Sequence, residues 1–432
     1  MLDTRMLLWV QAGLFSLSLV ATIGCEGETE ETTPIQVRLM ADLSGPNSHA
    51  DRSFQAGRID HIDAINASGG LSGRTIEYEE ADTSGDPGNA LQEYLLWKQA
   101  PSWPEVVTLF SSGTSETQIL LDEIKNASLP VFSKSTSGTL TSPVGSTQTI
   151  ELEDGTIKIL ENPGTPYNFF TSIDSSSAAR AAVDFIAASG GHTITFACCT
   201  DTDSCGGAVE AARHYLKGRY DMEVLDDLPI AYNDTPENIS AKPRVYLLHH
   251  PSAEWLWLGT PRSISAEIIK VLRDKDLKFL VDVSSMNEAL DDLSEGAGRG
   301  KVFGLVAATP FGDMVASQAM PDLVRTHTQS TRHAEDDFMD LDYVMGYAQV
   351  ALWSIAVERL QAKNEKISRE NLRGELESMR QVNTGGLLKP VGFTPEDHRP
   401  SLAADVYKID KNGLFTHIDL LEVERKTEWL GW

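Results

Sequence analysis

Hydroxyl side chains follow two apolar segments that we expect to be buried strands. The segment 106–110 leads into Ser111-Ser-Gly-Thr-Ser115, and the segment 129–133 leads into Lys134-Ser-Thr-Ser137. In an open α/β sheet, ligands bind beyond the carboxyl ends of the strands. Hydroxyls and unpaired backbone N–H groups at a helix start suit a carboxylate. The pattern therefore predicts a small-molecule site that includes Ser112, Gly113, Thr114, Ser115, Ser135, Thr136 and Ser137.

A helix cap is the alternative interpretation of the first hydroxyl cluster. Ser and Thr are favoured N-caps, so the segment 111–115 alone fits a cap as well as it fits a ligand. Two adjacent strands that both end in hydroxyl-rich loops are harder to explain by capping and favour a binding site. We find no Ser-His-acid set, nucleophile elbow, Walker loop or GxGxxG motif, so we expect no enzyme activity, cofactor or metal.

The elements that must position these hydroxyls alternate between strand and helix patterns. Ile35, Val37 and Leu39 alternate with polar residues, whereas Phe54, Ile59 and Ile62 recur at helical spacing. Further strands are expected at 76–79, 106–110, 129–133, 192–198, 245–248, 255–259, 278–283 and 302–307, with helices between most of them and a long helix at 341–360. The acidic stretch 335–342 is expected to be the solvated start of that helix. This order predicts an α/β fold with more than one doubly wound parallel sheet.

The charge and length exclude several classes of protein. The chain has 432 residues, with 36 Lys and Arg against 63 Asp and Glu, for a formal net charge of −27. Such a field repels phosphate backbones and anionic membrane surfaces, so no nucleic-acid partner is expected. The length suggests two or three domains with full hydrophobic cores.

The first 34 residues have the features of an export signal and a tether. An uncharged apolar stretch at 6–20 follows Arg5 and is short for a membrane span. The segment 21–25 resembles a bacterial lipoprotein box, which implies lipidation of Cys25; a plain cleaved signal and an uncleaved anchor are the alternatives. The acidic, polar segment 26–34 is typical of a flexible tether.

The remaining cysteines cluster in one short segment, at Cys198, Cys199 and Cys205. A zinc site would need a further ligand, and no His lies nearby at ligand spacing. In an exported protein one disulfide across this loop is the better interpretation, and we assign it to Cys199 and Cys205.

Longer strings of sequence are similar to a known family. The segment Ile35-Gln-Val-Arg-Leu-Met-Ala-Asp-Leu-Ser-Gly-Pro46 and the segment Asn66-Ala-Ser-Gly-Gly-Leu-Ser-Gly-Arg74 resemble the branched-chain amino acid binding proteins of ABC transporters, which have the type I periplasmic fold. The resemblance covers about 35–432 and weakens between 200 and 300. It implies two α/β lobes joined by three hinge strands, with the ligand in the cleft between them. The implied ranges are 35–166 with 306–395 for lobe 1, and 167–305 with 396–432 for lobe 2.

The resemblance also implies roles for particular residues. The ligand carboxylate would be held by Thr114 or Ser115 and by the segment 135–137. In the second lobe the sequence departs from the family: Cys205-Gly206 stands where a Tyr-Gly is usual, and Thr260 stands where an aromatic residue is usual. The acid that would hold the ligand ammonium aligns with Val283, one residue from Asp282, which we predict as the acid. The segment 144–163 has the pattern of a hairpin insertion near the hinge.

Two functions follow as expectations. The first is a monomeric, lipid-anchored solute-binding protein on the periplasmic or outer face of the bacterial envelope. It would deliver a small amino-acid-like, carboxylate or amide ligand to an ABC permease of the inner membrane by hinge closure. The alternative is a sensory or cell-envelope regulatory lipoprotein with the same fold and a protein partner, which the altered second-lobe motif favours.

Overall fold

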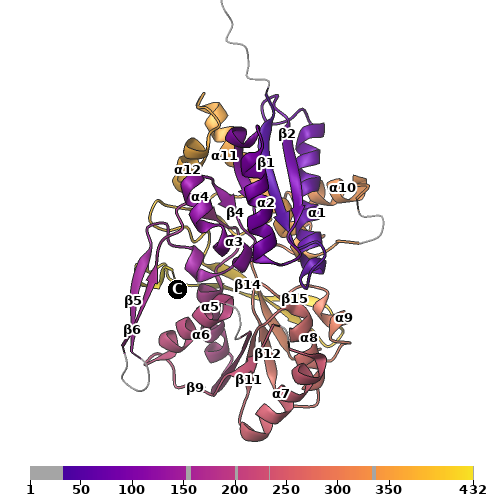
Figure 1. Ribbon diagram of the computed structural model, residues 1–432. Helices are drawn as coiled ribbons and strands as arrows, with labels where there is room; N and C mark the ends of the chain where they lie inside the picture. The colour runs from indigo at the N-terminus through magenta and orange to yellow at the C-terminus, as the bar shows by residue number, and fades with distance from the viewer. Residues whose placement is uncertain (1–32, 152–156, 200–202, 233, 333–336, 432) are drawn as a thin grey trace, which may run out of the picture.

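The first of two lobes is built on a parallel sheet (Figure 1). The computed structural model describes residues 33–431 apart from 152–156, 200–202, 233 and 333–336. Five parallel strands form the first sheet in the order β2-β1-β3-β4-β7. Their bounds are Ile35–Ala41 (β1), Ile76–Asp82 (β2), Val106–Phe110 (β3), Val131–Phe132 (β4) and Asn168–Phe169 (β7). Every residue of β3 is buried, because helices cover both faces of a parallel sheet.

Helices from both ends of the chain cover this sheet. They are α1 (Ser48–Ala67), α2 (Pro87–Gln99), α3 (Thr114–Ile119), α4 (Leu121–Ala127), α10 (Met320–Gln329), α11 (Leu341–Ala362) and α12 (Arg369–Ser378), with a 3₁₀ turn η1 at Trp103–Glu105. The predicted apolar positions Phe54, Ile59 and Ile62 of α1 are buried, as expected. Helix α1 packs closely against α11, because Gly57 and Gly346 leave no side chain at the crossing.

The second sheet is mixed. Its order is β10-β8-β11-β12-β13-β14-β15, with β9 paired beside β8. The strands are β8 (Thr193–Cys199), β9 (Glu223–Val224), β10 (Leu228–Ile230), β11 (Trp255–Gly259), β12 (Lys278–Val281), β13 (Val302–Val306), β14 (Ala403–Ile409) and β15 (Phe415–Glu422). The strands from β10 to β13 are parallel, whereas β14 and β15 add an antiparallel edge. The predicted α/β class with two parallel sheets is confirmed.

The second lobe contains the remaining helices. These are α5 (Ser175–Ala188), α6 (Asp203–Leu216), α7 (Pro236–His249), α8 (Arg262–Val271) and α9 (Leu290–Leu293), with 3₁₀ turns η2 (Gly138–Leu140) and η3 (Thr427–Trp429) near the connections. The strands β5 (Ser146–Glu151) and β6 (Ile157–Asn162) form the predicted hairpin, which extends along one side of the molecule (Figure 1). Its status as an insertion in the family stays a prediction. Within the described part of the chain, no helix combines the length and apolar character of a membrane span.

The chain passes between the lobes three times. It leaves the first sheet after β7 and enters α5, returns after β13 towards α10, and crosses again between α12 and β14. The strand β7 lies in the first sheet, although it follows the boundary that we predicted at residue 166. The other predicted boundaries remain predictions.

The predicted strand at 245–248 is wrong, because this segment belongs to helix α7. The Thr235 side chain caps the helix by accepting from the N–H of Asn238, and Pro236 stands at its first turn. Val245 and Leu248 are exposed, so their apolar character does not report a buried strand.

The predicted helix start in the acidic stretch is correct in position, and Asp337 is exposed as expected, but the predicted exposure is wrong for Asp340 and Asp342. Asp340 caps α11, with its carboxylate accepting from the N–H of Tyr343. Asp340 and Asp342 are both buried, whereas residues 333–336 lie outside the described residues. Asp340 lies against Ser53 of α1, whereas Asp342 is covered by Arg262 and Asn287 of the second lobe.

Candidate ligand site between the two lobes

The two predicted hydroxyl loops of the first lobe meet. Thr114 Oγ1 lies 2.7 Å from Ser135 Oγ, which joins the loop after β3 to the loop after β4. Helix α3 begins after Gly113, which makes no side-chain cap bond, so capping does not account for Thr114. Capping does account for Ser137, whose hydroxyl accepts from the N–H of Thr139 at the start of η2.

Arg58 of α1 holds the strand ends beneath these loops. Its guanidinium is buried and donates to Ser111 O (2.8 Å) and Met40 O (3.3 Å), at the ends of β3 and β1. It also donates to Gln349 Oε1 of α11 at 2.8 Å. Burial lowers the pKa of Arg58 to about 9. The sequence pattern places this residue on a helix and gives no sign of its contacts.

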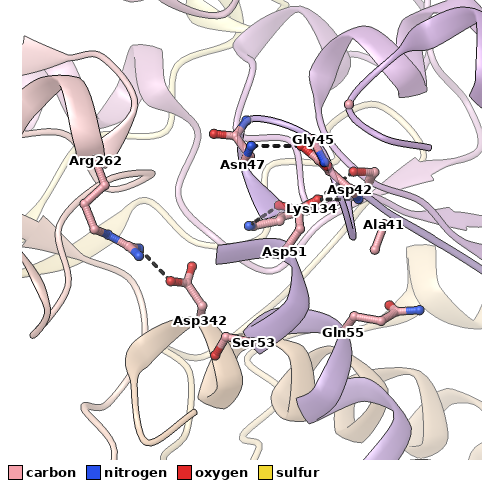
Figure 2. A network of polar contacts seen from close by, with 12 residues as sticks. Ala41, Asp42, Gly45, Asn47, Asp51, Ser53, Gln55, Lys134, Arg262 and Asp342 are labelled. Carbon is pink, nitrogen blue, oxygen red and sulfur yellow. Dashed lines mark hydrogen bonds and ion pairs between the residues drawn. The ribbon is translucent and has the colours of Figure 1, made fainter. Parts of the chain in front are cut away.

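A second residue of α1, Asp51, contacts both hydroxyl loops, and Figure 2 shows it beside Lys134 and Asp42. Its Oδ2 accepts from Ser112 Oγ at 2.8 Å and from the N–H of Asp42 at 3.1 Å. Its Oδ1 pairs with Lys134 Nζ at 2.5 Å. All of these groups are buried or nearly so. Sequence reasoning missed Asp51, because nothing in the spacing of α1 marks it.

Asp282 supplies the acid on the second-lobe side. It is 2% exposed, and its Oδ2 accepts from Ser175 Oγ (3.2 Å) and Ser284 Oγ (2.8 Å). Among the described residues Oδ1 has no hydrogen-bond partner. Burial raises the pKa of Asp282. Ser175 Oγ also lies 2.9 Å from Thr136 Oγ1, so hydroxyls connect the first-lobe loop to the second-lobe acid.

The other predicted second-lobe residue, Thr260, forms its hydrogen bonds within its own lobe. Its Oγ1 lies 2.8 Å from Ser265 Oγ of α8, and its carbonyl oxygen accepts from Ser285 Oγ. Val283, the alternative position for the acid, is buried in an apolar cluster. The structure therefore brings Thr136 and Asp282 together and leaves Thr260 apart from that connection.

A polar contact joins the lobes beside these loops, and we call it the interlobe contact. Arg262 of α8 pairs with Asp342 of α11 at 2.6 Å, with each side chain 9% exposed. Asp342 also accepts from Asn287 Nδ2 at 3.1 Å, and Glu288 accepts from the N–H of Leu341 at 3.1 Å. Figure 2 shows the Arg262–Asp342 pair with the cluster around Asp51.

The predicted disulfide between Cys199 and Cys205 is wrong for Cys199. Cys199 is buried and remains a thiol, whereas Cys198 is disulfide-bonded. Successive side chains of a strand point to opposite faces. Cys198 therefore shares an apolar cluster with Ala208 and Val209 of α6, and Cys199 belongs to a different cluster. The side chain of Cys205 and the predicted lipidation site Cys25 lie outside the described residues.

Comparison with known families decides the class of this chain. The sequence model of the periplasmic binding protein family matches residues 34–413. This chain belongs to the periplasmic binding protein family. No curated protein sequence matches it.

Solved structures share the fold of this periplasmic binding protein. An ABC transporter substrate-binding protein of Aeropyrum pernix has a TM-score of 0.75 and 20% identity, covering 92% of this chain and 98% of its own. A fatty acid ABC transporter substrate-binding protein of Thermomonospora curvata has a TM-score of 0.73 and 17% identity, covering 92% and 94%. A branched chain amino acid ABC transporter protein of Thermus thermophilus with bound valine has a TM-score of 0.73 and 15% identity, covering 90% and 97%. The expected resemblance is confirmed for the fold.

Proposed function

We propose that this periplasmic binding protein captures a small, polar, amino-acid-like ligand between its lobes and delivers it to an ABC permease. The observation that carries this proposal is the connection from Thr136 through Ser175 to Asp282, a buried carboxylate with one oxygen that has no hydrogen-bond partner in the described part of the chain. A buried carboxylate without its full set of partners is costly. A ligand ammonium or amide N–H would offset that cost.

Hinge closure is the mechanism that we propose. Contacts from both lobes exist together only when the lobes are closed, so a ligand that touches both favours the closed state. The hydroxyls of Thr114 and Ser135 are first-lobe contacts in this scheme, because each can donate or accept a hydrogen bond. Asp282 is the second-lobe contact. The permease then recognises the closed, loaded protein.

We further propose that the protein is a monomer tethered to the bacterial envelope through a lipid on Cys25. The support is the apolar segment 6–20, the lipoprotein-like segment 21–25 and the polar tether 26–34. Intact-mass measurement of the protein from a bacterial membrane fraction tests this assignment. A lipidated Cys25 adds a diacylglycerol mass that Cys25→Ser lacks, and equal masses would contradict the proposal.

A thermal-shift screen tests the ligand-binding function. The purified protein is titrated with L-leucine, L-glutamine, L-arginine, L-leucinamide, agmatine, acetamide and butyrate. A compound at one hundred times its dissociation constant adds about 2.7 kcal/mol of stability, which raises the Tm by several degrees. If no compound raises the Tm, the transport function fails and the partner-protein alternative gains.

Paired variants locate the site. Thr114→Ala with Ser135→Ala should weaken any compound found in the screen, because both hydroxyls leave the first-lobe loops. Ser68→Ala with Thr328→Ala is the matched control, since these hydroxyls bond only to carbonyls of their own helices. If the variant with Thr114→Ala and Ser135→Ala binds the compound with unchanged affinity, the placement of the site is contradicted.

A further inference from the structure

We propose that the ligand presents an amine, amide or guanidinium to the first lobe, and not a carboxylate, because Asp51 already occupies two donors of the hydroxyl loops, Ser112 and Lys134. This inference rests on the proposed function and narrows its ligand class. It concerns the loops after β3 and β4, where the sequence pattern predicts a carboxylate cradle.

Two donors suited to a carboxylate, one from each loop, are already used within the first lobe. Ser112 Oγ donates to Asp51 Oδ2 at 2.8 Å, and Ser112 is 1% exposed. Lys134, the cation of the second loop, pairs with Asp51 Oδ1 at 2.5 Å. A ligand carboxylate would have to displace Asp51 from both partners and leave that buried acid without its cation, with the N–H of Asp42 as its remaining donor. Loss of the cation of a buried pair costs several kcal/mol in other proteins.

A second acid lies against the start of helix α3. Glu116 is buried in the first turn of α3 and accepts from Ser115 Oγ at 3.1 Å. A Cβ atom added to Gly113 would lie 3.0 Å from Glu116 Oε2, so the carboxylate lies against the loop itself. The start of the helix, which would favour a ligand anion, already has the carboxyl group of Glu116 beside it, and burial raises the pKa of that group.

The charges of the first-lobe acids also act on a residue of the second lobe. The pKa of Tyr232, in the segment after β10, is raised by burial and then by the charges of Asp42, Glu116 and Asp51. Among the described residues, two cations lie beside these three acids, and both are engaged: Lys134 pairs with Asp51, and Arg58 donates to Ser111 O and Gln349 Oε1. The first-lobe side of the site therefore carries a net negative charge, which repels an approaching carboxylate.

The acceptors that remain suit a ligand that donates hydrogen bonds. Asp282 Oδ1 has no partner among the described residues. The hydroxyls of Thr114 and Ser135 bond to each other, and either atom can accept from a third group. A cation or an amide N–H satisfies these acceptors without opposing Asp51 and Glu116.

Matched compounds test the inference by isothermal titration calorimetry on the full chain. L-arginine and agmatine differ by the carboxylate, and L-leucine and L-leucinamide differ by the charge on that group. In at least one pair, the member without a carboxylate should bind at least tenfold more tightly than its partner. Asp51→Asn should reduce this preference to less than threefold, because it removes the competing charge and keeps an oxygen that accepts from Ser112.

Two controls keep the test interpretable. Asp322→Asn removes the same charge from an exposed pair with Arg325 and should leave the preference unchanged. The double variant Asp51→Asn with Lys134→Gln removes the buried pair as a whole, so a loss of folding in the single variant does not end the test. Circular dichroism checks the fold of each variant.

The outcomes that would overturn the inference can be distinguished from failure of the proposed function. If the carboxylate member of each pair binds as tightly as its partner or more tightly, the inference is overturned and the proposed function stands. If Asp51→Asn keeps the full preference, Asp51 is not its source and the inference is overturned. If none of the four compounds binds and the wider screen is also negative, the inference falls together with the proposed function.

Discussion

Asp282 shows how one position just beyond the end of a strand decides whether a side chain is polar or part of the core. Strand β12 ends at Val281, and Val283 packs into the apolar cluster of the second lobe. The carboxylate of Asp282 instead receives hydrogen bonds from Ser175 and Ser284. The family alignment placed the acid at Val283. The strand has ended at Val281 and the chain turns from Asp282, which leaves the carboxylate among Ser175 and Ser284 while Val283 enters the apolar cluster.

We predict that ligand affinity rises with pH through a proton on Asp282. Burial raises the pKa of this group, so it binds a proton at pH values where an ordinary Asp is ionised. A ligand cation favours the carboxylate and releases that proton, so affinity should increase as pH rises through the raised pKa. Titration calorimetry with L-leucinamide, in two buffers of different ionisation enthalpy, measures the proton released.

Asp282→Asn is the matched variant for this prediction. The amide oxygen can still accept from Ser175 and Ser284, so the fold should persist. Removing one partner of a buried charge pair costs roughly 2–5 kcal/mol of binding, and the pH dependence should disappear. A variant that keeps both the affinity and the pH dependence would show that Asp282 does not contact the ligand.

At the scale of elements, the crossing of α1 and α11 fixes the first lobe. Helix α1 carries Asp51 and Arg58, which contact the loops after β3 and β4. Helix α11 reaches the interlobe contact with its first residues. Small changes in this crossing should therefore move both the loops after β3 and β4 and the start of α11 at the interlobe contact.

We predict that Gly346→Ala destabilises the protein. A Cβ atom at Gly346 would lie 1.8 Å from Phe54 O of α1, so the two helices would have to separate. Overpacking of this kind costs about 1–3 kcal/mol or more, which urea unfolding can measure. The control is Gly374→Ala in α12, where nothing lies within 4 Å and a gain of roughly 0.5–1 kcal/mol is expected. Equal effects at both sites would contradict the close crossing.

At the scale of the whole molecule, the interlobe contact links the two lobes without a ligand. Arg262, Asn287 and Glu288 of the second lobe meet the first residues of α11. Both members of the Arg262–Asp342 pair are largely buried, so solvent screens this pair less than a surface pair. We expect this contact to favour the closed arrangement.

We predict that Arg262→Gln shifts the unliganded protein towards an open form. The variant leaves Asp342 buried without its cation, and separation of the lobes rehydrates that carboxylate. Small-angle X-ray scattering should show a larger radius of gyration for the variant than for the wild type. Arg325→Gln, which removes an exposed Arg from α10, should leave the scattering curve unchanged. Identical curves for all three proteins would contradict a role for the interlobe contact.

The stabilising effect of the interlobe contact should depend on pH, because the contact includes Glu288. Burial raises its pKa to about 7, with further contributions from Asp340 and Asp342. An acid with a raised pKa binds more protons in the folded state, so its stabilising effect is present below pH 4.5 and is lost as pH rises to about 7. The wild type should lose up to about 1.4 kcal/mol per pH unit in this window relative to Glu288→Gln. Chemical unfolding at several pH values measures the difference, and parallel curves would contradict it.

The sequence by itself determined the α/β class, the order of most elements and the two hydroxyl loops after β3 and β4. These features depend on local periodicity and on turn residues, so residues that are close together in the chain determine them. Only the tertiary structure decided that Asp51 and Lys134 fill those loops, that Arg58 holds the strand ends, and that Cys199 faces away from α6. Such contacts join residues far apart in the chain, and no local pattern encodes the distance between two helices packed on a sheet.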